Sequence, residues 1–244
     1  MRYIIKISYD GTNYSGYQKQ PNKITIQETI ENAMLQVFNT SVDIVASGRT
    51  DAGVSAIEQV CHFDIDKEID IRKSIGYMNS LLPKDIRVLD IMVVDDNFHA
   101  RFTAKRKTYE YYFYVSREPI PVYDNMATLV GYNIDMDKVF NCVKHFEGTH
   151  DFSAFSASNT AVVDKVRTIH EIGITQVDDC LYKLVITGNG FLYNMVRIVM
   201  GTIVDVGMGK IAVDDIPKII ESCDRKKAGK TISAKGLYLK KVVY

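Results

Sequence analysis

The chain lacks several features that mark special classes of protein. Among its 244 residues there is no tryptophan, and there are only 5 prolines and 4 cysteines. The cysteines form no C-x-x-C pair, so we expect reduced, buried thiols and neither a disulfide framework nor a zinc site; they are Cys61, Cys142, Cys180 and Cys223. No apolar run approaches the roughly 18 residues that a membrane-spanning helix needs. The first six residues contain no signal-peptide core either, and together these absences predict a soluble, cytoplasmic protein.

The chain also lacks an excess of charge of either sign. It has 30 basic and 30 acidic residues, so the formal net charge is zero. This balance argues against an indiscriminate nucleic-acid coat protein, but RNA binding needs only a local basic face. Two clusters could form such a face: Lys-Arg-Lys at residues 105–107, and Arg-Lys-Lys at residues 225–227 with Lys230. A solvated surface explains each cluster equally well.

Hydrophobic periodicity predicts a repeated order of strands and helices. The first half should contain strand 2–9, helix 26–38 behind a Thr25/Glu28 capping box, strands 42–46 and 59–65, helix 71–82 and strand 86–94. The second half should contain strand 109–115, helix 136–146, strands 167–176 and 182–187, helices 191–206 and 214–223, and strand 237–243. The order βαββαβ is that of a ferredoxin-like unit.

We therefore predict an α+β protein of two ferredoxin-like units, residues 1–104 and 105–244. Their strands would share an extended mixed, mainly antiparallel sheet with helices on one face. Two unrelated α+β domains would give a similar pattern and remain the alternative. No Pro/Gly/Ser-rich linker marks the boundary, which favours close packing of the halves over flexible tethering.

Residues 48–54, Gly-Arg-Thr-Asp-Ala-Gly-Val, are the most informative run. The two glycines permit positive φ and let a bulky ligand approach the backbone closely. Arg49 can pair with a phosphate through two parallel hydrogen bonds. Asp51 is then a fixed negative charge placed where the sugar of a polyanion would lie. This combination indicates a nucleotide site, because ordinary hairpin loops rarely need it.

Basic and aromatic residues gather where the two predicted halves meet. Residues 99–102 read His-Ala-Arg-Phe, and residues 106–109 read Arg-Lys-Thr-Tyr. Aromatic rings stack on bases, and basic side chains follow phosphates. Tyr109 also begins an aromatic stretch, residues 109–114, and the residues alone favour a plain sheet position for it.

Residues 191–197, Phe-Leu-Tyr-Asn-Met-Val-Arg, are predicted to open a helix after a glycine-containing loop. Phe191, Met195 and Ile198 fall on one helical face and should be core. Arg197 lies among apolar neighbours, and an isolated buried charge is too costly. It should therefore be either exposed or paired with a buried carboxylate, for which we name Asp51 as a hypothesis.

With these motifs assembled, the chain resembles the TruA-type tRNA pseudouridine synthases almost from end to end. The matching runs occur in one shared order: residues 9–11, 16–20, 48–54, 99–102, 106–111, 148–152, 191–197 and 236–239. Three departures are visible. The family's Val-His is Val54-Ser55 here, its Gly-Trp-Gln is Gly-Tyr-Gln at residues 16–18, and its Ala-Pro before Gly236 is replaced by residues 232–234, Ile-Ser-Ala. None touches a residue with a chemical role, but they leave open which paralogue this is.

The resemblance implies isomerisation of uridine to pseudouridine in tRNA, with no cofactor and no metal, by a homodimer that grips one tRNA across both subunits. It implies that Asp51 is catalytic and that Arg49 helps to hold the target nucleotide out of the stack. Tyr109 would stack on the flipped uracil, and Arg197 would pair with the catalytic carboxylate. The expected targets are uridines 38 to 40 of the anticodon stem-loop. The N-terminal half would carry the Asp51 loop, and the C-terminal half would complete the RNA-binding cleft.

The chemistry explains why these residue types are needed. Breaking the N1–C1′ bond develops positive character at the ribose, which an adjacent carboxylate stabilises or captures covalently. The sequence does not distinguish attack of Asp51 on C1′ from removal of a C2′ proton. Extruding the base costs a few kcal/mol, and stacking on Tyr109 would return roughly 1–3 kcal/mol. A phenol is a weak base at neutral pH, so we assign Tyr109 stacking first and proton transfer second.

Three other functions fit parts of the sequence. A paralogous synthase would act on other RNA uridines. An RNA-binding or chaperone protein could have kept the fold and lost catalysis, although the intact loop of residues 48–53 disfavours this. A nucleoside hydrolase acting on small molecules is permitted by the neutral charge, but the basic and aromatic segment fits a polymer better.

Overall fold

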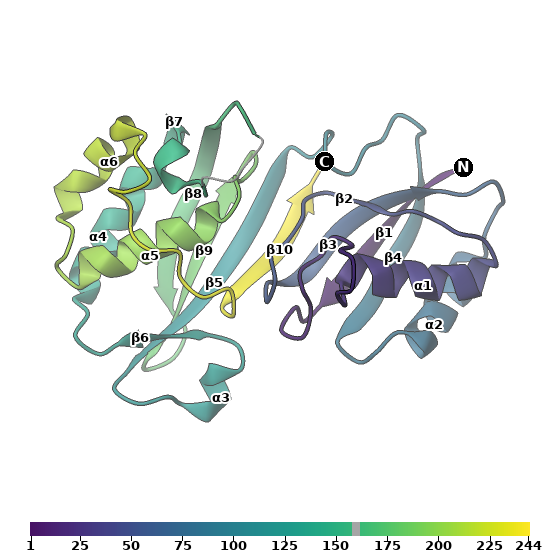
Figure 1. The fold of residues 1–244 in the computed structure, drawn as a ribbon, viewed down its shortest axis with the longest axis horizontal. Coiled ribbons are helices and arrows are strands. Elements are labelled where there is room, and N and C mark those ends of the chain that lie inside the picture. The colour runs from purple at the N-terminus through teal and green to yellow at the C-terminus, as the bar shows by residue number, and fades with distance from the viewer. Residues whose placement is uncertain (158–161) are drawn as a thin grey trace. The chain divides into compact units, whose positions relative to one another are not determined.

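The computed structural model describes residues 1–157 and 162–244 and divides into two compact units (Figure 1). Unit 1 comprises Met1–Lys105 and Tyr238–Tyr244, and unit 2 comprises Arg106–Leu237. Both units contain helices and strands, and most strand pairs among the described residues are antiparallel. The predicted α+β class is confirmed.

Unit 1 has the predicted βαββαβ order. Its elements are β1 (Arg2–Tyr9), α1 (Ile26–Phe38), β2 (Val45–Ala46), β3 (Ser55–Asp64), α2 (Ile71–Leu81) and β4 (Ile86–Val94). The strands pair in the order β4-β1-β3, with β2 on the far side of β3, and all of these pairs are antiparallel. This is the strand order of a ferredoxin-like unit.

The helices of unit 1 begin where the sequence provides a side-chain cap. The Thr25 side chain accepts a hydrogen bond from the Glu28 backbone amide before α1, and the Asp70 side chain accepts one from the Lys73 amide before α2. Behind α1, the ring of Phe38 stacks near Phe63 of β3 at a centroid distance of 6.1 Å. The capping box and the apolar periodicity thus predicted α1 correctly.

The last strand, β10 (Leu237–Val243), forms with the predicted bounds. Its residues Tyr238 and Leu239 pair in parallel with Ser55 and Ala56 at the start of β3. The strand therefore lies against the residues that follow the loop of residues 48–54, although about 180 residues separate the two segments in the sequence. Periodicity predicts a strand but carries no information about a partner so distant.

Unit 2 contains more elements than the sequence predicted. In order they are β5 (Arg106–Ser116), α3 (Pro121–Asp124), β6 (Thr128–Gly131), α4 (Met136–Cys142), a 3₁₀ turn η1 (Val143–Phe146), β7 (Gly148–Asp151), η2 (Ser153–Phe155), β8 (Val166–Gln176), β9 (Leu181–Gly188), α5 (Met195–Gly207), η3 (Val213–Asp215) and α6 (Ile216–Ser222). The strands pair in the order β5-β9-β8-β7, and β6 runs parallel to β5. The short elements α3, β6 and β7 were missed because four residues show no clear period.

Two local predictions were wrong. The helix expected from residue 191 begins at Met195, because Asn194 adopts a left-handed conformation with φ of 60° and interrupts it. Phe191 is therefore half-buried in the loop before the helix. All four cysteines are free. Cys61 and Cys142 are buried as expected, but Cys180 is only half-buried and Cys223 is exposed at the end of α6. No helix in residues 1–157 and 162–244 is long and apolar enough to cross a bilayer.

Candidate active site

The loop between β2 and β3 carries Arg49 and Asp51. The Val54 amide donates to the Asp51 carbonyl at 3.1 Å, which closes a turn, and Gly53 adopts φ of 78° within it. Gly48 is not among the described glycines with positive φ. The Arg49 side chain is exposed, and Asp51 is half-buried. The loop thus presents a guanidinium to solvent and keeps a carboxylate partly sheltered.

A buried glutamine fixes the start of this loop. Gln59 of β3 is fully buried, and its amide nitrogen donates to the Gly48 carbonyl at 2.8 Å. Its amide oxygen accepts from the Ser47 hydroxyl at 2.6 Å. The Ser47 backbone amide donates to the Val60 carbonyl at 2.8 Å. A buried amide that satisfies two loop groups restrains the backbone just before Arg49, because breaking either bond would leave a buried polar group unpaired.

A second set of contacts fixes the residue between Arg49 and Asp51. The hydroxyl of Thr50 shares a buried 2.8 Å hydrogen bond with the Tyr9 hydroxyl, and its carbonyl accepts from the Tyr17 amide at 3.0 Å. Gly16 lies directly against the loop with φ of 93°, and a Cβ there would stand 3.0 Å from the Thr50 carbonyl oxygen. The loop is therefore held on both sides of Arg49.

The resemblance motif at residues 9–11 also has a structural role. A Cβ on Gly11 would lie 2.0 Å from the Val54 carbonyl oxygen, so only glycine fits beside the end of the loop. The Gly11 amide donates to the Ser55 hydroxyl at 3.0 Å. Sequence reasoning missed the parts played by Gln59, Tyr9 and Gly11, since nothing local in the sequence links them to residues 48–54.

An ion pair between exposed Lys19 and buried Glu31 ties α1 to the strand that leads into the loop. Glu31 is buried, and its Oε1 accepts from the Gln27 amide nitrogen at 2.9 Å and from the Ile44 backbone amide at 3.0 Å. Its other oxygen pairs with the Lys19 ammonium. The run of residues 16–20 is thereby joined to α1 and to residue 44. The sequence held one hint of this contact, because Glu31 directly follows the apolar residue Ile30 within the predicted helix.

In unit 2, Tyr109 lies on β5 opposite Ile186 of β9. It is 8% exposed, and its ring meets Phe191 edge-on at a centroid distance of 5.1 Å. The sheet position that the residues favoured is therefore correct.

Arg197 lies in the first turn of α5 and is half-buried. Its Nε donates to the Ile232 carbonyl at 2.8 Å, and its Nη1 donates to the Asn194 side-chain oxygen at 2.7 Å. Burial raises the pKa of the Tyr111 phenol, and the neighbouring Arg197 cation opposes part of that rise. The guanidinium is therefore held by the Asn194 side chain and by the backbone carbonyl of Ile232.

Close backbone packing holds the segment that accepts the Arg197 hydrogen bond. A Cβ on Gly201 of α5 would lie 1.8 Å from the Lys230 carbonyl oxygen, and a Cβ on Gly229 would lie 2.7 Å from the Gly201 carbonyl carbon. The Gly229 amide donates to the Thr202 hydroxyl at 2.9 Å. Two glycines thus let residues 229–232 run directly along α5 to the turn that contains Arg197.

The predicted site residues are divided between the two units. Arg49 and Asp51 share one loop of unit 1, whereas Tyr109 and Arg197 belong to unit 2. Arg101 and Phe102 are exposed, with the guanidinium 5.7 Å from the ring centroid. Within the described residues, no group of three or more His, Cys, Asp or Glu side chains is arranged to hold a metal ion.

Comparisons with known proteins give one consistent result. A family model described as tRNA pseudouridine synthase matches residues 5–103 and 142–244. The chain is 45% identical over its whole length to the tRNA pseudouridine synthase A of Bacillus subtilis, with 99% of that protein covered. It is 44% identical to the protein of the same name from Acetivibrio thermocellus, over 98% of this chain and 97% of that one.

Among solved structures, a chain of a Cbf5-Nop10-Gar1 complex matches 97% of this chain and 57% of its own length, at 12% identity and a TM-score of 0.38. So weak a likeness carries no weight beside the sequence relatives. Identity above 40% over the full length, together with the family model, settles the assignment: the chain belongs to the tRNA pseudouridine synthase family.

Proposed function

We propose that this isomerase converts uridines 38 to 40 in the anticodon stem-loop of tRNA to pseudouridine, with Asp51 as the catalytic carboxylate. The observation that carries the proposal is the loop of residues 48–54, in which Asp51 is half-buried and the backbone is fixed on both sides of Arg49. Catalysis at a sugar carbon needs a carboxylate held in one place, because misplacement by about 1 Å can cost roughly 100-fold in rate.

In the proposed reaction the N1–C1′ bond breaks and leaves positive character on the ribose. Asp51 stabilises this charge, either by forming a bond to C1′ or by taking a C2′ proton. The uracil then turns, and C5 bonds to C1′ while the bond to Asp51 breaks or the C2′ proton returns. Finally C5 loses its proton and N1 gains one, so that the product is an isomer of the substrate. Arg197 would supply the opposite charge that keeps Asp51 ionised, since a guanidinium stays protonated under all physiological conditions.

The target uridine must leave its stack before Asp51 can reach the sugar. In our proposal Arg49, which is exposed, occupies the space that the base leaves, and Tyr109 stacks on the extruded uracil. These assignments require the N-terminal half to carry the Asp51 loop and the C-terminal half to complete the RNA-binding cleft. We further propose that the enzyme is a cytoplasmic homodimer that binds one tRNA across both subunits.

The experiment that tests this function is a map of pseudouridine in total RNA from cells with and without the gene. The proposal predicts loss of the modification at tRNA positions 38 to 40 alone, and its return when the wild-type gene is restored. Loss at other RNA uridines would identify a paralogous specificity and contradict the proposed target. An unchanged map would favour an RNA-binding protein without catalysis.

A further inference from the structure

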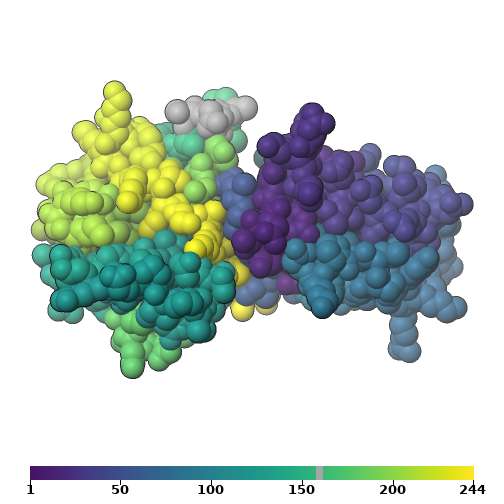
Figure 2. All heavy atoms as spheres, turned by 60° about the horizontal axis from the view of Figure 1, so that its bottom comes forward, coloured from purple at the N-terminus to yellow at the C-terminus, as the bar shows by residue number. Residues whose placement is uncertain are grey.

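The basic cluster near the C-terminus has no part in the function proposed above. Residues 224–230 contain four basic residues, Arg225, Lys226, Lys227 and Lys230, and a single acidic one, Asp224. In a chain whose net charge is zero, so dense a local excess of positive charge stands out. Lys226, Lys227 and Lys230 are exposed. Figure 2 shows that many of the residues that follow α5, coloured lime to yellow, lie on the surface of unit 2.

This cluster is built on a fixed loop. The Arg225 guanidinium donates to the carbonyls of Ala228 and Gly229, at 3.3 and 2.9 Å. The Lys227 amide donates to the Asp224 carbonyl at 3.1 Å, which closes a turn. Gly229 is held against α5 by the contacts described above. Arg225 therefore serves the loop itself, and the lysines are presented to solvent from a backbone that needs little further ordering.

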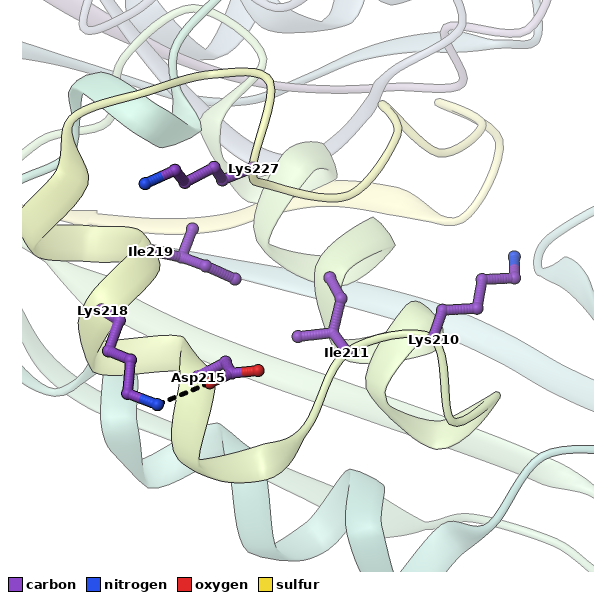
Figure 3. Close-up of a pocket in the computed structure, with 6 residues that line it drawn as sticks. All are labelled: Lys210, Ile211, Asp215, Lys218, Ile219 and Lys227. Carbon is purple, nitrogen blue, oxygen red and sulfur yellow. Dashed lines mark hydrogen bonds and ion pairs between the residues drawn. The ribbon is translucent and has the colours of Figure 1, made fainter.

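Beside the loop is a hollow of about 340 Å³ lined by Lys210, Ile211, Asp215, Lys218, Ile219 and Lys227 (Figure 3). Ile211 and Ile219 form its apolar floor. Lys218 pairs with Asp215 at 2.8 Å, and Lys210 pairs with Asp205 at 3.0 Å. Among the residues that the structure describes, none is recorded as an ion-pair partner of Lys227. Carboxylates thus partly neutralise Lys210 and Lys218, while the rim of the hollow keeps an excess of positive charge.

The three lysines do not converge on one point. Figure 3 shows Lys227 and Lys218 on the side of the hollow near Ile219, while the Lys210 side chain extends away at the other end. A second hollow of about 370 Å³ also includes Lys210, together with Tyr132, Met208 and two neighbours. A single small anion could not contact all three ammonium groups in this arrangement. A chain of phosphates could, because successive phosphates of a strand are spaced along the surface.

We propose that Lys210, Lys218 and Lys227 form a binding site for the phosphodiester backbone of the substrate tRNA. The apolar floor accommodates ribose, and the lysines contact phosphates in a way that is independent of base sequence. This inference rests on the proposed function only in taking tRNA as the ligand. It requires neither a particular target uridine nor a chemical role for any lysine.

The test compares tRNA binding by two triple variants at several salt concentrations, using filter binding with purified tRNA. In the first, Lys210, Lys218 and Lys227 are each changed to Gln. We expect its affinity at 0.1 M salt to fall about 10- to 100-fold, and the slope of log Kd against log salt to decrease by about 2 to 3, since each phosphate contact contributes roughly 0.7 to 0.9. The KM for tRNA should rise by a similar factor.

The matched control changes Lys73, Lys138 and Lys144 to Gln. These lysines are also exposed, and each pairs with an acidic residue three positions away, as Lys218 does. Binding by the control should match the wild type. A third variant, Asp215→Asn, removes a negative charge from the rim and should tighten tRNA binding about two- to threefold.

Equal affinity and equal salt slope for the first triple variant and the control would overturn the proposal. So would a loss of turnover without a loss of affinity. Competition by inorganic phosphate at constant ionic strength, without any effect of the lysine changes on tRNA, would indicate a small-anion site instead. Failure of the proposed function would appear separately, as absence of pseudouridine with the wild-type enzyme.

Discussion

The loop of residues 47–54 and the segment of residues 229–232 each support a proposed functional residue, but they are held by different means. Side-chain hydrogen bonds from Gln59 and Tyr9 fix the first. Direct packing of backbone on backbone through Gly201 and Gly229 fixes the second, which in turn accepts the Arg197 hydrogen bond. The position of the first segment therefore depends on particular polar side chains that bond to it. The position of the second depends on glycines, whose lack of a side chain lets the two backbones touch.

The difference predicts how each region should fail. Removing a polar group from the first should release the loop and leave a buried atom unpaired, while the fold survives. Adding a single methyl group to the second should displace the chain, since interiors cannot absorb an atom within 2 Å of another. The variants below test this comparison, starting with the largest effect.

Arg197→Met removes the charge that the second region holds in place. If Arg197 supplies the counter-charge that we propose for Asp51, activity should fall roughly 100-fold, which corresponds to a loss of about 3 kcal/mol. The measurement is kcat/KM on tRNA by tritium release from 5-tritiated uridine. Arg197→Lys is the control, because it keeps the charge and should restore part of the activity. Unchanged turnover in Arg197→Met would remove the proposed ion pair with Asp51.

The contacts that hold the loop of residues 47–54 and the segment of residues 229–232 could mostly not be predicted from the sequence. The Gly-Arg-Thr-Asp-Ala-Gly run pointed to Asp51 and Arg49, and the apolar spacing predicted α1 and β4 within a residue or two. Periodicity could not show that β10 lies beside β3, nor that Gln59 bonds to Gly48, because such contacts depend on the folded chain. The start of α5 was misplaced because the left-handed conformation of Asn194 overrides a continuous apolar pattern.

Gly201→Ala should destabilise the enzyme by about 2–4 kcal/mol, since the new Cβ would lie 1.8 Å from the Lys230 carbonyl oxygen and the segment must move. Urea unfolding measures this effect. Gly76→Ala is the matched control. Gly76 is in α2 with nothing within 4 Å of an added Cβ, so alanine should stabilise the enzyme by about 0.5–1 kcal/mol. Equal effects of the two changes would contradict the packing account.

Gln59→Leu removes the two side-chain hydrogen bonds that hold residues 47 and 48 at the start of the loop. The Gly48 carbonyl and the Ser47 hydroxyl lose a buried partner, which should cost about 1–3 kcal/mol of unfolding free energy. Because the loop loosens, kcat should fall about 10-fold or more while tRNA affinity is retained. Gln176→Leu serves as the control, since Gln176 is exposed and should tolerate the change. A fall in affinity with unchanged kcat would contradict a positioning role.

The smallest effect concerns His62 of β3, next to the first region. Burial lowers its pKa, and the nearby His99 and Arg2 lower it further, while Asp64 opposes them. Its Nδ1 accepts the Ala100 amide at 3.2 Å. The folded enzyme therefore binds this proton more weakly than the unfolded chain, so the contribution of His62 is complete above the unfolded pKa of about 6.5 and is lost as the pH falls below it.

The enzyme should accordingly lose thermal stability between pH 7.5 and pH 5.5. In His62→Gln part of this pH dependence should disappear, which differential scanning calorimetry at both pH values would measure. An identical pH dependence in the variant and the wild type would show that other groups are responsible.

The proposed reaction depends most on the carboxylate of Asp51, and the variant Asp51→Asn tests that dependence most directly. The amide keeps the size of the side chain and removes its charge. With purified enzyme and tRNA that contains 5-tritiated uridine, we predict that tritium release falls at least about 1000-fold while tRNA affinity and thermal stability stay close to wild type. Tritium release at the wild-type rate in Asp51→Asn would contradict the central claim.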